Sequence, residues 1–142
     1  MSQDPRVTYP AEATSDRLGV PALPLTTLAL PDTYVSQSSP TEIHGYRQAT
    51  WFPVVTVLDG AATKISVKIE WTQDGGVVYG PQGTESISSG IVAVTAAVWE
   101  YPAVVGGLEP IPLPVIAPGA RVSIKADAGT TTQCYINIVR QA

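Results

Sequence analysis

The chain has 142 residues, which is long enough for one domain whose hydrophobic core needs neither a disulfide nor a metal. Its formal net charge is −4, with 12 acidic and 8 basic side chains, and this balance disfavours nucleic acid as a partner because such binding depends on Lys and Arg. The only cysteine, Cys134, excludes an internal disulfide and a metal site made of several thiolates.

The chain is poor in charge. Charged residues form 14% of it and hydrophobic residues 44%, whereas an ordinary globular domain has about 25% charged residues. We therefore expect much of the surface to be covered by something other than water. The sequence contains neither a signal-peptide pattern nor a run of about 18 apolar residues, so we expect a soluble protein with no membrane partner.

Residues 1–25 contain four prolines among polar residues and follow neither a strand period nor a helix period. The pattern is typical of an extended N-terminal arm, and a disordered tail is the other interpretation. We therefore divide the chain into an arm, residues 1–25, and a β-sandwich domain, residues 26–142. The apolar side chains with which the arm would lie on a neighbouring surface are Leu18, Val20, Leu23 and Leu25.

The next segments have the pattern of strands. Residues 49–58 are mostly apolar and include Pro53, which predicts an edge or a bulge because proline donates no ladder hydrogen bond. Residues 64–71 alternate between apolar and polar side chains, as a half-buried antiparallel strand requires. The apolar side, which we expect to face the core, consists of Ile65, Val67, Ile69 and Trp71.

Residues 69–80, IEWTQDGGVVYG, predict a hairpin. Asp74, Gly75 and Gly76 tolerate the positive φ of a tight turn and lie between two strand-like flanks. The segment lacks the alternating oxygen ligands of a calcium loop, so we expect no metal there.

Three later segments complete the strand pattern. Residues 91–99 are small and β-branched and favour a buried strand. Four prolines between 108 and 118 predict an extended path without regular pairing. Residues 121–126 and 131–139 predict a closing hairpin around a turn at 127–130. The side chains of this hairpin that we expect to face inward are Val122, Ile124, Cys134, Ile136 and Ile138.

The number and spacing of these segments predict the fold class. About eight strands follow one another roughly every ten residues, without a helix pattern or an internal repeat. Thirteen prolines and twelve glycines agree with this, because both residues interrupt helices and mark turns. We therefore expect an all-β protein, an antiparallel β-sandwich that is jelly-roll-like and carries an extended N-terminal arm.

The residues that could carry out chemistry are few and isolated. His44 is the only histidine, and no Ser or Cys nucleophile motif accompanies it. Cys134 lies on the inward side of a predicted strand, which favours a small core residue over a reactive thiolate. The acidic residues lie singly in separate elements, so the sequence shows no paired carboxylates of a glycosidase. We therefore expect no catalytic residue, no metal and no cofactor.

Aromatic residues lie at strand ends and beside turns, where exposed rings anchor protein interfaces or stack on sugars. Packing in the core is the third interpretation, and it applies most directly to Trp71 on the inward side of its strand. All three interpretations stay open for the set as a whole. The rings that we take as interface candidates are Trp51, Tyr79, Trp99 and Tyr101.

The low charge, the N-terminal arm and strands such as KISVKIEWTQDGG and GARVSIKADAGTTTQCYINIV resemble structural proteins of tailed bacteriophages. The chain is most similar to the small jelly-roll decoration or cement proteins on the heads of these phages. The resemblance implies a virion protein, made in the host cytoplasm, that binds the outside of the assembled capsid and stabilises it without catalysis. Its implied partners are the major capsid protein and copies of itself, as a dimer or trimer at local symmetry axes.

A glycan-binding or adhesion module of a phage tail or fibre is the alternative function. In that function Trp71, Tyr79 and the turn between them would stack on sugar.

Overall fold

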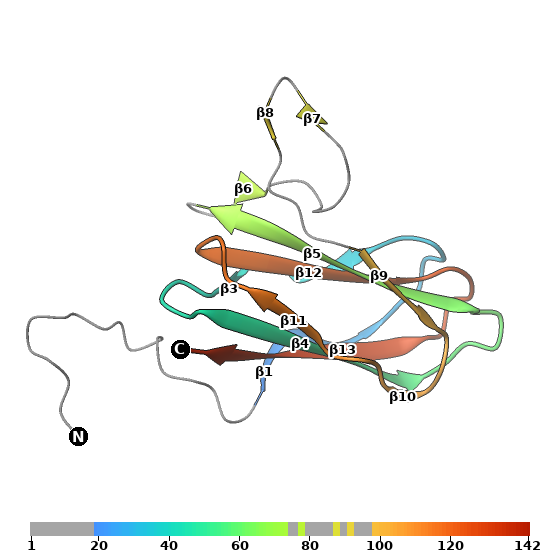
Figure 1. Ribbon diagram of the computed structural model, residues 1–142. Coiled ribbons are helices and arrows are strands. Elements are labelled where there is room, and N and C mark those ends of the chain that lie inside the picture. Colours follow the sequence, from blue (N-terminus) through green and yellow to red (C-terminus); the bar gives the residue numbers. More distant parts are fainter. Residues whose placement is uncertain (1–18, 74–76, 79–86, 89–90, 93–97) are drawn as a thin grey trace, which may run out of the picture.

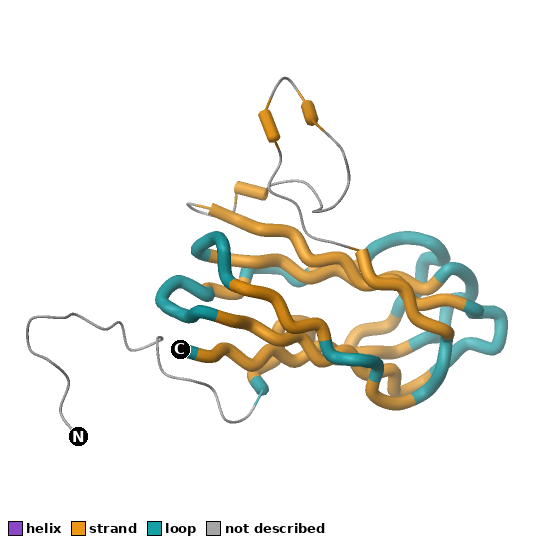
Figure 2. The backbone as a smooth tube through the Cα atoms, viewed as in Figure 1, coloured by secondary structure: helices purple, strands orange, loops and turns teal. Residues whose placement is uncertain are grey.

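The computed structural model consists of two antiparallel sheets that pack face to face as a β-sandwich (Figure 1). The structure describes residues 19–73, 77–78, 87–88, 91–92 and 98–142. Strands and loops make up these described residues, and no helix occurs among them (Figure 2). The predicted all-β class and the antiparallel sandwich are therefore confirmed.

Sheet A is the lower layer in Figure 1, and β13 and β4 form its centre. Its strands, in spatial order, are β1 (Val20–Thr27), β13 (Gln133–Gln141), β4 (Gln48–Val57) and, both beside β4, β10 (Gly106–Gly107) and β11 (Ile111–Pro114). Edge strand β1 is thus the neighbour of β13.

Sheet B is the upper layer and has β12 and β5 at its centre (Figure 1). Its strands are β2 (Val35–Ser36) and β3 (Thr41–Glu42), both beside β12 (Gly119–Ala126), then β5 (Lys64–Gln73), which pairs with β6 (Val77–Val78) and β9 (Val98–Pro102). A separate ladder joins β7 (Ile87–Ser88) to β8 (Ile91–Val92).

The strand pairs are nested along the chain. β1 pairs with β13, β2 and β3 pair with β12, β4 pairs with β10 and β11, and β5 pairs with β9. Early strands therefore pair with late ones, and of these four groups of pairs β5 with β9 is the closest in sequence. The chain follows the path of an antiparallel ribbon whose two halves run side by side and which folds over to make both sheets.

The hydrophobic core lies between the sheets and uses alternate residues of the central strands. Every side chain that the alternation predicted to face inward is at most 1% exposed, which confirms the predicted faces. These side chains are Ile65, Val67, Ile69, Trp71, Val122, Ile124, Cys134, Ile136 and Ile138.

Strand β4 is an interior strand, so the predicted edge at Pro53 is wrong, whereas the other prediction, a bulge, agrees with a one-residue register shift beside it: two residues separate Trp51 from Val54, and three separate Gly107 from Ile111. β13 lies on one side of β4, where Pro53 pairs in regular register with Ile136. On the other side, β11 pairs with β4 up to Trp51 and β10 pairs from Val54, so Pro53 faces the break between them. The Pro53 carbonyl accepts a hydrogen bond from the backbone N–H of Leu108 at 2.9 Å on that side. A proline fits there because its missing N–H would point into the break.

The proline-rich segment 108–118 does pair, contrary to the prediction of an unpaired path. Residues 111–114 form β11, in which Pro112 pairs with Thr50 and Pro114 with Gln48. This is compatible with proline because β11 is an edge strand, which bonds to a neighbour along one side only.

Strands β12 and β13 do not pair with each other, so the predicted closing hairpin is wrong as a pairing. β12 belongs to sheet B and β13 to sheet A, and the loop 127–132 crosses from one sheet to the other. Both strands nevertheless have buried inward faces, because the two sheets face the same core. The alternation of apolar and polar side chains is therefore the same for two strands of a hairpin and for two strands that belong to facing sheets.

The hairpin predicted in residues 69–80 is confirmed by its flanks. Thr72 pairs with Val78 and Gln73 with Val77. The turn residues 74–76 and Tyr79 lie outside the described residues. The strand predicted over 91–99 is divided between β8 and β9, and residues 93–97 between them also lie outside the described part.

Residues 20–27 form β1, so residues 20–25 belong to the sandwich and not to an arm. β1 pairs with β13 from Val20 opposite Ile138 to Thr27 opposite Gln133, with two register shifts. These shifts and the two prolines of β1 hide its strand period in the sequence. Residues 1–18 of the predicted arm lie outside the described residues.

Candidate interaction surface

The predicted anchors of the arm have different environments on β1. Leu23 is 3% exposed and belongs to the core, so it is not available to a neighbouring surface. Val20 is half-buried and packs against the core. Leu25 is 61% exposed and is the anchor that a partner can reach. Leu18 lies outside the described residues.

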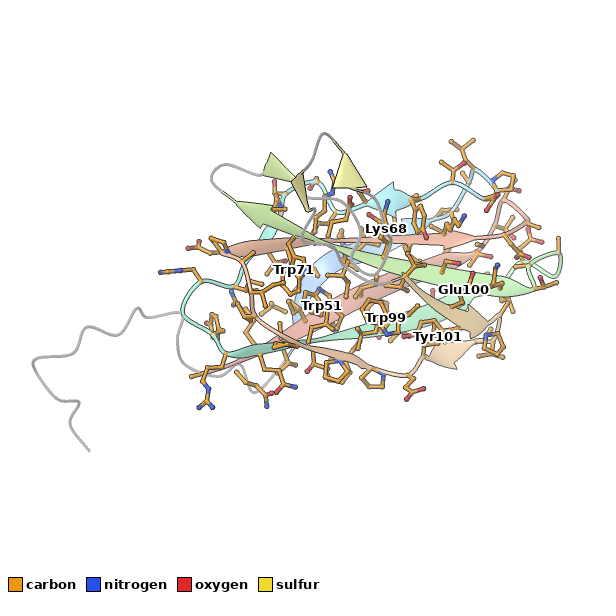
Figure 3. The ribbon with its side chains drawn as sticks, turned by 45° about the horizontal axis from the view of Figure 1, so that its top comes forward. Trp51, Lys68, Trp71, Trp99, Glu100 and Tyr101 are labelled. Atoms are coloured by element: carbon orange, nitrogen blue, oxygen red, sulfur yellow. The ribbon has the colours of Figure 1, made fainter. Side chains whose placement is uncertain are left out.

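Trp51 is a core residue, and its prediction as an interface ring is wrong. It has no exposed surface, and Trp71 has 1%. Figure 3 shows both rings between the two sheets. The alternation of β4 places Trp51 on the buried side, together with Val55. Burial of Trp71 also removes one of the two rings with which the alternative function would stack on sugar.

Trp99 and Tyr101 lie on β9 and are half-buried against the core (Figure 3). The Tyr101 hydroxyl donates a hydrogen bond to the Glu109 carbonyl at 2.8 Å. Burial raises the pKa of Tyr101 to about 12, and the Glu109 carboxylate adds to the rise. Tyr101 thus ties β9 to the segment that follows β10, and each of the two rings offers only part of its face to a partner.

The outward side of sheet A is a surface that the sequence did not point to. Along β4 the residues at 49, 51, 53 and 55 are buried, while those at 50, 52 and 54 are half-buried and point outward. β13 alternates in the same way. We call this surface the neutral face. Its outward residues are Thr50, Phe52, Val54 and Thr56 on β4, Gln133, Tyr135, Asn137 and Val139 on β13, Pro112 and Pro114 on β11, and Pro21 and Thr27 on β1.

The neutral face contains no charged residue among these positions. Its centre is apolar, because Val54 pairs with Tyr135 and Phe52 lies next to them on β4. The outward side of an antiparallel sheet is usually polar when it faces water. An uncharged, partly apolar outward side is therefore typical of a surface that another molecule covers.

The outward side of sheet B has the opposite character. Its outward positions hold most of the charged side chains of the described strands, as Lys68 and Glu100 illustrate in Figure 3. These charged residues are Lys64, Lys68, Glu70, Glu100, Arg121 and Lys125. The low charge of the chain is thus distributed unevenly between its two faces.

Ion pairs and a tyrosine ring organise the charges of sheet B. Arg121 Nη2 lies 3.0 Å from Glu70 Oε1, whose side chain is 8% exposed. The Tyr34 ring lies under two ammonium groups, with its centroid 4.4 Å from Lys68 Nζ and 4.9 Å from Lys125 Nζ. These cations are therefore engaged within the molecule.

The loops at one end of the sandwich, on the right in Figure 1, are held together by Asp59. Asp59 lies in the β4–β5 loop. Its carboxylate accepts hydrogen bonds from the Ala61 N–H at 2.9 Å, the Thr130 N–H at 3.0 Å and the Thr131 hydroxyl at 2.9 Å. The last two belong to the β12–β13 loop. These donors, with the Ala61 N–H first, lower the pKa of Asp59 from its usual 3.8 to about 2.

Asp127 makes the reciprocal connection from the β12–β13 loop. Its carboxylate accepts hydrogen bonds from the hydroxyl and N–H of Thr63 and from the N–H of Lys64. The Thr63 hydroxyl, followed by these two N–H groups, lowers the pKa of Asp127 to about 2. Two charged carboxylates therefore fix the loops from both sheets in one arrangement.

This loop end carries most of the exposed aliphatic side chains of the described residues. Val104 and Val105 directly precede Gly106, whose partner on β4 is Val55, two residues from Val57. The exposed side chains of the loop end are Leu30 at 64%, Val57 at 45%, Val104 at 49% and Val105 at 63%. The structure thus places at the same end of the sandwich apolar residues that are up to 75 positions apart in sequence.

The residues considered for chemistry remain isolated in the fold. His44 is exposed in the loop between β3 and β4. Cys134 is fully buried, and burial raises its pKa to about 12, as expected for a core residue. In the described part of the chain, no three His, Cys, Asp or Glu side chains form a group that could hold a metal. No helix long and apolar enough to span a membrane is present among the described residues.

Comparisons with protein-family models, with curated proteins and with solved structures gave no match to this chain. A function must therefore be supported by the surfaces described above.

Proposed function

We propose that this protein is a non-catalytic structural protein of a tailed-phage virion, which binds the outside of the assembled capsid and stabilises it as a cement or decoration protein. Its partners in this proposal are the major capsid protein and copies of itself.

The nested strand pairing supports the proposal. The first strand pairs with the last and the following strands pair inwards in the same order, within two sheets, and we infer a jelly-roll arrangement from this nesting. The resemblance in sequence implies the same architecture. A shared fold is compatible with many functions, so the support for binding has to come from a surface.

The observation that carries the proposal is the rigid, apolar loop end. Val57 directly precedes the β4–β5 loop, which Asp59 and Asp127 tie to the β12–β13 loop. Backbone hydrogen bonds attach the other two loops: the Ala103 N–H, just before Val104 and Val105, donates to the Thr63 carbonyl at 3.1 Å, and the Asp32 N–H, two residues after Leu30, donates to the Ala126 carbonyl at 2.8 Å. Exposed apolar side chains bind another protein by removing their surface from water. Preformed loops lose little conformational freedom on binding, so more of this burial appears as affinity. Such a surface suits docking onto a preformed lattice.

Binding of this kind stabilises a capsid by mass action. A protein that binds only the assembled, expanded lattice shifts the equilibrium towards that lattice, and many copies add their contributions. The chain then needs a firm fold and a contact surface, and it needs no reactive group.

The glycan-binding alternative has less support. Trp71 is 1% exposed and cannot stack on a sugar without unfolding of the core. Trp99 and Tyr101 are half-buried edge residues. A glycan array that gives a strong signal, lost on replacement of these two rings, would favour the alternative.

The test uses phage particles that lack the chain, produced by deleting its gene from the genome that encodes it. Purified protein is added back, binding is measured by co-sedimentation, and capsid stability by the temperature at which a dye detects released DNA. We expect the protein to bind and raise that temperature. Val105→Asp should weaken binding, because Val105 is 63% exposed on the loop end.

Val98→Asp is the matched control, since Val98 is an exposed valine on the outward side of sheet B. It should bind like the wild type. Absence of the chain from purified virions would contradict the proposal. Equal binding by the wild type, Val105→Asp and Val98→Asp would contradict the assignment of the loop end as the binding surface.

A further inference from the structure

We propose that the neutral face of sheet A is the surface on which a second copy of this chain docks, sheet against sheet, about a two-fold axis. The inference names the surface for the self-association in the proposed function. It rests on the geometry of sheet A, and its test needs no capsid.

Charge favours a second copy over a partner of opposite charge. A two-fold axis places the same patch of both copies together, so every charge near the axis would meet its own copy. The neutral face has no charged side chain, whereas the outward side of sheet B has six. An acidic or basic partner would find no counter-charge on the neutral face. Two molecules of net charge −4 can meet there without burying a charge.

The free edge of β11 disfavours association through strand addition. The Val115 N–H donates to the Arg47 carbonyl at 2.9 Å, on the side of β4. Backbone groups of successive residues point to opposite sides of a strand, so the nitrogen and carbonyl of Pro112 and Pro114 point to the free edge. Neither proline has an N–H to donate there. This edge of sheet A therefore cannot accept another strand in regular pairing.

The opposite edge of sheet A is similarly protected. β1 contains Pro21 and Pro24 and has two register shifts against β13. Prolines and bulges of this kind prevent edge-to-edge pairing. Because prolines interrupt the β11 edge and the β1 edge, the outward side is the larger continuous part of sheet A through which copies can associate.

The size of the neutral face suits a specific dimer. β4 has ten residues and β13 nine, so the face is about 30 Å long at about 3.3 Å per residue. Four strand positions about 4.8 Å apart make it about 19 Å wide. Its area is thus about 600 Å² per copy, or about 1,200 Å² for both, which lies in the range of specific interfaces.

The residues at the centre of the face suit packing between sheets. Phe52, Val54 and Tyr135 lie on the two central strands and form an apolar middle. Asn137 pairs with Phe52, and Thr50 and Thr56 lie beside this middle on β4, so its polar neighbours are uncharged. Aromatic residues in a centre without charge are typical of the core of a protein interface. Of the loop end, Val57 pairs with Gln133 at the border of the neutral face, whereas Leu30, Val104 and Val105 lie in loops beyond the strands and stay free for the capsid in such a dimer (Figure 1).

The test is the oligomeric state of the full-length protein in solution, measured by sedimentation equilibrium at several concentrations. We expect a monomer–dimer equilibrium for the wild type. Val54→Lys should raise the dimer dissociation constant at least about tenfold, because the two-fold axis brings both introduced charges into one interface. Val98→Lys is the matched control on sheet B and should leave the constant unchanged.

A second variant separates lost association from lost folding. Asn137→Asp keeps the size of the side chain and adds one charge to the face, so it should also weaken the dimer. Circular dichroism and thermal melting at concentrations below the dissociation constant should be the same for all four proteins. A wild type that remains monomeric at about 1 mM, a trimer, or an unchanged dimer of Val54→Lys would overturn the inference. Capsid binding by a strictly monomeric protein would leave the proposed function intact.

Discussion

Leu23 and Leu25 lie two residues apart on β1, and replacing each with alanine distinguishes a core strand from a partner-binding arm. Leu23 is 3% exposed and Leu25 is 61% exposed. Leu→Ala removes three carbon groups, and at about 0.8 kcal/mol each their burial contributes about 2.4 kcal/mol. The cavity left in a core adds to this, and measured losses run from about 2 to 5 kcal/mol.

We expect Leu23→Ala to lower the free energy of unfolding by about 3 kcal/mol, since the edge strand β1 can settle inward and fill part of the cavity. Leu25→Ala should change it by less than about 0.5 kcal/mol. Urea unfolding followed by tryptophan fluorescence measures both values, because Trp51 and Trp71 are buried in the folded state. For a chain of this size, a loss of about 3 kcal/mol lowers the melting temperature by about 6–12 °C. A loss below about 1 kcal/mol for Leu23→Ala would refute the packing of β1 on the core.

Three further predictions concern the loop end and the thiol. Asp59 and Asp127 have pKa values of about 2, below the usual 3.8, so their contribution to stability is complete above about pH 4 and is lost as the pH falls towards 2. Replacing both with Asn should flatten the loss of melting temperature over this pH window, and an unchanged profile would contradict their role. Gly129→Ala should cost more than about 1 kcal/mol in urea unfolding, because φ is +91° and the new Cβ would lie 2.4 Å from Asp59 Cγ. Gly60→Ala, whose Cβ would meet nothing within 4 Å, should cost clearly less in the same measurement. Cys134 should resist iodoacetamide at pH 8 until urea unfolds the protein, because burial raises its pKa to about 12, and mass spectrometry would detect early labelling that contradicts this.

Alternation in the sequence predicted the inward faces of β5, β12 and β13, because the period of two depends only on neighbours along the chain. It placed Ile69 and Ile136 in the core correctly. It did not predict the partner of each strand. β12 and β13 look like a hairpin in the sequence, yet they belong to different sheets, since a loop of six residues can either turn within a sheet or cross between two sheets.

The candidate surfaces were predicted less well than the core. Trp51 was chosen as an interface ring because it is aromatic and lies near the start of a predicted strand, whereas burial depends on which side of β4 it occupies. The loop end could not be found from the sequence, because Leu30, Val57 and Val105 reach the same end of the sandwich only through the folding of the ribbon. No local pattern marks residues that meet in this way.

The neutral face shows why the sequence indicated a covered surface without locating it. The charged fraction of 14% predicted that part of the surface is covered, but a composition does not tell which part of the fold the uncharged residues occupy. β4 is apolar on both sides, with Trp51 and Val55 inward and Phe52 and Val54 outward, so its alternation could not separate the core side from the solvent side. In an antiparallel sheet a strand of this kind is itself a sign of a second covered side. The structure separates the two sides and shows that the charges gather on sheet B. The low charge of the chain is therefore concentrated on one face, and a single lysine at position 54 is the change that should matter most to that face.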